Sequence, residues 1–228
     1  QRRHRVLRAR VLLPALGAAR RAAQTTQCLS NIRNLEQAQM LYSNDYKGYL
    51  IDVGLAHGGA GDETISWINT LSDYYGTTLI VHSPGDRSAY WPTDEGGAGL
   101  TVNGKPRRTS YGMNDWLSRT YNPGIRAREP YDNLSKIPLP HATVQFLTMA
   151  RDGEFAVSDH VHVENWGQGT RPPQTASTQV EINAWGGPER SFESISNYGF
   201  LDGHAATLRF REVYTDYQHN RLDPEAAR

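Results

Sequence analysis

The residues from 11 to 49 constrain the fold most, because small and apolar side chains recur there at the spacing of an α-helix. The recurring positions are Leu12, Ala15, Ala19 and Ala22, and then Cys28, Ile32, Leu35, Ala38 and Tyr42. The pattern predicts one long amphipathic helix that stops at residues 44–48, which end in a glycine. A single domain of this size cannot bury such a helix along its whole length. We therefore expect its first half to pack on a membrane or on other copies of the helix.

The length and composition indicate one good-sized domain with an extension. The chain has 228 residues, of which 38% are hydrophobic and 10% aromatic, and this is typical of a folded rather than a disordered protein. We expect a stem of residues 1–48, made of the helix and a basic arm, and a globular head of residues 49–228.

The net charge of zero hides an uneven distribution. Residues 1–24 contain seven of the 24 Lys and Arg and none of the 24 Asp and Glu, so the remainder carries a formal charge of −7. A basic arm of this kind suits nucleic acid or anionic lipid. A run of charge is more often a solvated chain end, and we interpret residues 1–10 in that way and expect no nucleic-acid partner.

Cysteine content and hydropathy say little about the cellular compartment of the protein. Cys28 is the only cysteine, which excludes a disulfide within the chain. The apolar run at residues 11–16 is much shorter than the roughly 18 residues needed to cross a bilayer. The sequence also lacks an ordinary cleavable signal, so we expect the apolar anchor of this helix to be incomplete in this chain.

The rest of the chain predicts short elements separated by loops. We expect a helix from Thr64 that buries Trp67, a strand over residues 77–82, a turn at 83–86 and a strand ending at 110–114. A buried strand over 143–149 follows, then a long insertion over 159–190. Residues 196–211 predict a hairpin, since Asp202 and Gly203 supply the positive φ of a tight type I′ turn.

These elements, in this order, resemble the prepilin-type proteins, which include type IV pilins and type II secretion pseudopilins. The resemblance rests on the helix, on Trp67, on residues 83–86 and 110–114, and on an Asp-Gly-His signature at residues 202–204. It covers most of the chain, and the order and spacing of the motifs are more specific than any one of them.

The resemblance implies a fold class and a function. The fold expected is α+β, with the long helix laid across a small antiparallel sheet and a loop-rich head. The function implied is that of a non-enzymatic pseudopilin or minor pilin-like subunit. Its partners would be other pilin-like subunits, bound through the stem, and the inner-membrane secretion or pilus machinery. The protein would be anchored in the inner membrane and face the periplasm or the cell surface.

The sequence departs from this family at three places. Residues 1–10 are rich in arginine where the family has an apolar stem preceded by a leader. Ser83 precedes Pro84 where members often have a cysteine, so the disulfide partner implied for Cys28 is missing. Phe192 stands where the family signature has a histidine, so no role that depends on that histidine carries over.

One segment, residues 159–164, has the residue types of a divalent metal site. On a strand, His160, His162 and Glu164 would point to one face. Asp202 and His204 of the hairpin are candidates to complete the shell. The alternatives are a polar loop edge with hydrogen-bonded histidines and, for the hairpin pair, a purely structural turn.

Two further groups of side chains suggest weaker alternatives. Asp86, Asp94, Glu95 and Asp132 are candidate calcium ligands, although none has EF-hand spacing. Tryptophans 91, 116, 166 and 185 would, if exposed, stack on a sugar or a partner. The alternative function is therefore a metal- or carbohydrate-binding head tethered by the helix. The chain has no catalytic or nucleotide-binding motif, and we expect no enzyme activity.

Overall fold

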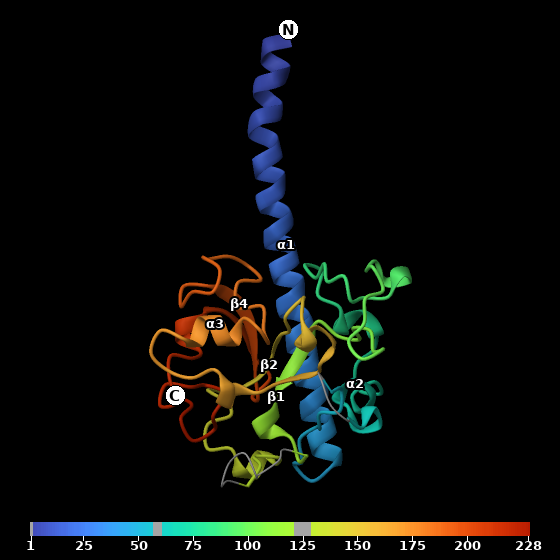
Figure 1. Ribbon diagram of the computed structural model, residues 1–228, viewed down its shortest axis with the longest axis vertical. Coiled ribbons are helices and arrows are strands. Elements are labelled where there is room, and N and C mark those ends of the chain that lie inside the picture. The colour runs from blue at the N-terminus through green and yellow to red at the C-terminus, as the bar shows by residue number, and fades with distance from the viewer. Residues whose placement is uncertain (1, 57–60, 121–128) are drawn as a thin grey trace.

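The computed structural model describes residues 2–56, 61–120 and 129–228, and side chains from residue 15 onward with the exception of Leu79. A long helix, α1, rises from a head in which a small sheet is surrounded by loops and short helices (Figure 1). The C-terminus lies on the head, at the opposite end of the molecule from the N-terminus.

Helix α1 spans Arg2–Asp45. The five apolar positions predicted for its second half, from Cys28 to Tyr42, are all buried, and that prediction is confirmed. The helix stops where predicted. Gly48 takes a φ of 84° and donates its N–H to the Ser43 carbonyl oxygen at 2.7 Å, which closes the last turn.

The sheet has five strands in the order β3-β1-β2-β4-β5. The strands are β1 (Tyr111–Asn114), β2 (Val144–Thr148), β3 (His160–Val161), β4 (Ile195–Phe200) and β5 (Ala205–Arg209). The α+β prediction is confirmed, but the sheet is mixed rather than wholly antiparallel, because β3 pairs parallel to β1. The chain returns to the β1 edge after forming β2, and a crossover of that length permits a parallel pair.

The second half of α1 packs on β2, β4 and β5, and shares one hydrophobic cluster with β1, β2 and helix α2 (Trp67–Thr70). The helix comes unusually close to β4 at Gly199. A Cβ atom at that position would overlap the side chains of Glu36 and Ile32. A glycine in this strand is therefore required by the approach of the helix.

The hairpin of β4 and β5 forms as predicted, but its turn differs from the prediction. Gly203 has a φ of 93°, whereas Asp202 is not among the three non-glycine residues with positive φ in the described chain. Gly203 donates its N–H to the Phe200 carbonyl at 2.9 Å, and the Phe200 N–H pairs with the His204 carbonyl at 3.0 Å. This is a three-residue loop with a left-handed glycine, a common alternative to the two-residue type I′ turn.

One local prediction is wrong. The strand expected over residues 77–82 is instead a 3-10 helix (Thr78–Val81), and the apolar run is buried by contact with α1 rather than by a strand ladder.

The long insertion over residues 159–190 contains regular elements. It forms β3 and helix α3 (Pro172–Ala176), and it buries Trp166 in a second hydrophobic cluster.

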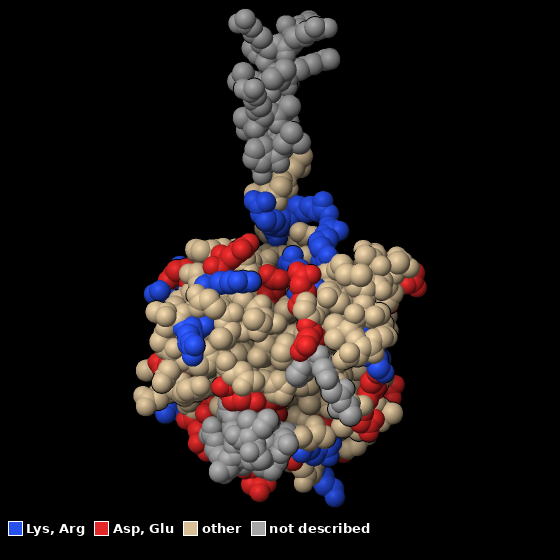
Figure 2. Space-filling view, in the orientation of Figure 1, with Lys and Arg blue, Asp and Glu red and all other residues tan. Residues whose placement is uncertain are grey.

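Lys and Arg side chains gather where α1 leaves the head, and acidic side chains lie directly beside them on the head (Figure 2). The rest of the visible head surface carries side chains of both signs. Arg20 and Arg21 are exposed. A search of the described residues finds no helix with the length and apolarity required to cross a membrane.

Candidate metal-binding site

The parallel pairing of β1 and β3 brings the two strand ends to one edge of the sheet. Asn114 pairs with Val161, so the next residue of each strand, Asp115 and His162, leaves the sheet at the same level. Each strand then turns at once into a 3-10 helix, Asp115–Leu117 after β1 and Val163–Asn165 after β3. The side chains that follow parallel strands therefore converge, as they do at the carboxyl edge of open sheets.

Three side chains meet at this edge. His162 Nδ1 lies 3.0 Å from Asp115 Oδ2 and 3.3 Å from Glu164 Oε1. One ligand atom from each residue can be chosen so that all three lie within 4.8 Å of one another. The sequence prediction placed His162 and Glu164 together correctly, but it did not include Asp115.

Burial and mutual contact control the charges of this cluster. The side chains of Asp115, Glu164 and His162 are 5%, 10% and 22% exposed. Burial raises the pKa of Asp115, and the hydrogen bond from His162 offsets part of that rise. Burial also acts to lower the pKa of His162, but the contacts with Asp115 and Glu164 outweigh it and raise that pKa to about 9.

Neighbouring groups hold the cluster in place. The Trp116 indole donates Nε1–H to Glu164 Oε2 at 3.3 Å. The backbone N–H of His162 donates to the Gln179 side-chain oxygen at 2.8 Å, and the Gln179 amide returns a 3.4 Å bond to the His162 carbonyl. Trp116 thus supports the Glu164 side chain, and Gln179 fixes the backbone of His162.

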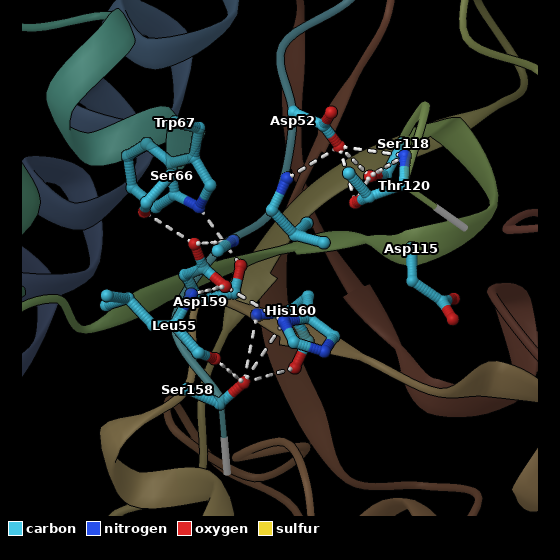
Figure 3. A network of polar contacts seen from close by, with 12 residues as sticks. Asp52, Leu55, Ser66, Trp67, Asp115, Ser118, Thr120, Ser158, Asp159 and His160 are labelled. Carbon is cyan, nitrogen blue, oxygen red and sulfur yellow. Dashed lines mark hydrogen bonds and ion pairs between the residues drawn. The ribbon is translucent and has the colours of Figure 1, made fainter. Parts of the chain in front are cut away.

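His160 lies beside the cluster but takes part in a different network. Its Nδ1 lies 2.9 Å from Asp159 Oδ1, and its ring meets the His162 ring at 5.0 Å between centroids and at 83°. Asp159 is fully buried and accepts hydrogen bonds from Gly54 N (2.9 Å), Leu55 N (3.1 Å) and Ser66 Oγ (2.6 Å). Figure 3 shows this network converging on Asp159, with Asp115 apart from it.

The other two candidate ligands, Asp202 and His204, are not brought into the cluster. They lie at the β4–β5 turn, where His204 Nδ1 is 2.5 Å from Asp202 Oδ1 and the Asp202 side chain also accepts from the His204 N–H at 3.2 Å. Their side chains are 37% and 46% exposed. The contacts that they make are those of a polar turn.

The four candidate calcium ligands do not gather either. Asp86 is buried and bound by Arg107, Asp132 is paired with Lys136, and Asp94 and Glu95 are exposed in a 3-10 helix. Among the described residues, Asp115, His162 and Glu164 are the only group of three or more metal-ligating side chains whose ligand atoms converge.

The four tryptophans pack within the head and do not form an exposed stacking surface. Trp91, Trp116 and Trp166 are at most 4% exposed, and Trp185 packs partly buried against the core. Phe192, which replaces the histidine of the family signature, is also partly buried and stacks with Phe210. These rings therefore stabilise the head and do not form a stacking platform for a sugar.

Comparisons with protein-family models, with curated proteins and with solved structures found no match to this chain. The observations that bear on function are therefore the projecting helix and the three-residue cluster at the sheet edge.

Proposed function

We propose that this protein is a non-enzymatic, pilin-like structural subunit that assembles with other subunits through its stem helix. The observation that carries the proposal is the division of α1 into two halves. From Cys28 onward, one face is buried in the head. Over residues 15–23 every residue is exposed except Gly17, which is half-buried, and Leu16 has 65% of its surface exposed.

The exposed part of the helix is suited to close packing with another helix. Residues 15–23 contain five alanines and one glycine. Small side chains of this kind allow helix backbones to approach closely, which is how helices associate where dispersion contacts dominate. Isolated helical segments are only marginally stable in water. A second helix beside this one would therefore stabilise the stem as well as bury it.

The contact between the stem and residues 82–84 supports the resemblance to prepilin-type proteins. Gln24 donates Nε2–H to the Pro84 carbonyl at 2.8 Å, and Asn31 donates Nδ2–H to the His82 carbonyl at 3.2 Å. These bonds flank Cys28 on the helix. The position that carries a cysteine in similar proteins thus lies along the same stretch of helix as Cys28.

The charge distribution favours a staggered arrangement of subunits. Identical stems at the same height would bring their Arg20 and Arg21 side chains together, and like charges at close range are destabilising. A shift along the helix axis would instead place these arginines beside the head of the next subunit, which attracts them because residues 25–228 carry a formal charge of −7. Attachment to the inner membrane and to secretion or pilus machinery belongs to the same proposal, with the head facing outward.

Site-directed cross-linking of the full chain tests the proposal. In cells that naturally make the protein, Ala18→Cys places a thiol on the exposed stem, whereas Asp152→Cys places one on the exposed head surface as a control. Cys28 is fully buried and serves as an unreactive background. We expect mild oxidation to give disulfide-linked species with Ala18→Cys but not with Asp152→Cys. If folded Ala18→Cys protein stays monomeric, the proposal is wrong.

A further inference from the structure

We propose that Asp115, His162 and Glu164 bind a divalent metal ion of the zinc type. This inference goes beyond the proposed assembly function, because it concerns the β1–β3 edge of the head and not the stem. It begins from the cluster geometry, in which three side chains with one nitrogen and two oxygen ligand atoms already converge.

The spacing of the ligand atoms matches the requirement of a tetrahedral ion. Zinc binds histidine nitrogen and carboxylate oxygen at about 2.0–2.2 Å, which places neighbouring ligand atoms about 3.3 Å apart in a tetrahedron. The observed separations from His162 Nδ1 are 3.0 Å to Asp115 and 3.3 Å to Glu164. Ligand atoms of all three residues lie within 4.8 Å of one another, and side-chain rotation would close the remaining separation around an ion.

A second observation favours a cation at this cluster. Asp115 Oδ1 is buried and has no hydrogen-bond partner in the part of the chain that the structure describes. A buried polar atom without a partner is costly, and native proteins rarely retain one without a reason. Here the unsatisfied oxygen belongs to a carboxylate that is already close to a second carboxylate, so a bound cation would stabilise both.

The donor set selects the class of metal. A histidine nitrogen with two carboxylates suits zinc and similar transition metals, whereas calcium takes six to eight oxygen ligands. Three protein ligands leave the fourth position for water or another ligand. Trp116 donates a hydrogen bond to the Glu164 carboxylate, which is the kind of outer-shell support that orients a metal ligand, and Gln179 fixes the His162 backbone.

The competing interpretation is a purely structural ion-pair network. In that case His162 carries a proton between the two carboxylates and the cluster has no affinity for metal. The two interpretations make opposite predictions for the isolated protein, because only a metal site binds zinc in a fixed stoichiometry that depends on these three side chains.

Isothermal titration of the full chain with Zn²⁺, after removal of metal with a chelator, separates them. We expect one ion per chain with a Kd in the micromolar range or tighter, and a rise in Tm on adding Zn²⁺. Asp115→Asn and Glu164→Gln keep the size of each side chain and should each weaken binding at least about tenfold, since losing even an outer-shell partner costs about 10–100-fold. The matched control is Asp202→Asn combined with His204→Ala, which removes an Asp–His pair outside the cluster and should leave binding unchanged.

Three results would overturn the proposal. The first is that wild-type protein binds no stoichiometric Zn²⁺. The second is that Asp115→Asn and Glu164→Gln bind Zn²⁺ as tightly as wild type, which would show an adventitious ion only. The third is that the hairpin control loses as much affinity as the cluster variants. Circular dichroism and Tm of the metal-free variants establish that each is folded. If Asp115→Asn does not fold, Glu164→Gln alone decides the test.

Discussion

Asp159 is the buried charge whose removal should disturb the head most. It is fully buried, and three donors from distant parts of the chain converge on its carboxylate: the N–H groups of Gly54 and Leu55 and the hydroxyl of Ser66. The carboxylate therefore fixes Gly54, Leu55 and Ser66 against β3. Asp159→Ala would leave all three donors buried without this acceptor, and it would release His160 from the same carboxylate.

The magnitude follows from those contacts. A buried donor that loses its acceptor costs about 1–3 kcal/mol, and the penalties for neighbouring groups do not add fully. Removing one partner from a buried charged network typically costs about 3–5 kcal/mol, and we expect a loss of that size. For a chain of this length, such a loss lowers Tm by about 10 °C.

Urea unfolding followed by tryptophan fluorescence measures this change, because Trp67 donates its indole N–H to the Asp159 carbonyl and reports on the same region. Asp152→Ala, at an exposed carboxylate, is the control and should change the free energy of unfolding by less than about 0.5 kcal/mol. If Asp159→Ala costs no more than about 1 kcal/mol, the network does not hold the head together and the reasoning fails.

Three further variants test other parts of the fold by the same unfolding assay. Arg107→Ala breaks a fully buried ion pair with Asp86 (2.8 Å) and should cost about 3–5 kcal/mol, and a value near zero would contradict a structural role for the pair. Burial raises the pKa of Glu36 well above its ordinary value of about 4.3. The contribution of Glu36 to folding stability is therefore greatest below about pH 4.3, and it is lost as the pH rises from there through the raised pKa. Glu36→Gln should therefore exceed wild type in stability at about pH 8 and approach it near pH 4, and a pH-independent difference would refute this. Gly199→Ala should cost about 1–3 kcal/mol by pushing α1 from β4, whereas Gly76→Ala, where a Cβ meets no atom within 4 Å, should be nearly neutral.

The elements that could be predicted from the sequence are those determined by the local spacing of apolar and turn-forming residues. The helical spacing from Cys28 to Tyr42 is a local property, and all five positions are buried as expected. The hairpin was predictable because Asp202 and Gly203 favour a turn wherever they occur between alternating strands. The short apolar run over residues 77–82 has no such signal, since burial against α1 and burial in a sheet require the same residues.

The candidate site shows why tertiary pairing limits sequence reasoning. His162 and Glu164 are two residues apart, so their proximity could be read from the sequence. Asp115 is 47 residues from His162 and joins them only because β1 and β3 pair in parallel with one particular register. A two-residue strand such as β3 has too little pattern to predict that pairing. The burial of the tryptophans could not be predicted for a related reason, because their spacing in the sequence does not reveal which side of a loop is covered.

The two proposals concern separate parts of the molecule, the stem and the β3 edge of the head, and can fail separately. The second half of α1 packs on β2, β4 and β5, whereas the metal cluster lies beyond β1 at the β3 edge. Zinc binding should therefore be unchanged by Ala18→Cys, and stem cross-linking should survive Asp115→Asn. If Asp115→Asn abolished cross-linking in folded protein, the ion would instead order a head surface that subunits need for contact. The stem would then position subunits, and the head would control whether they engage.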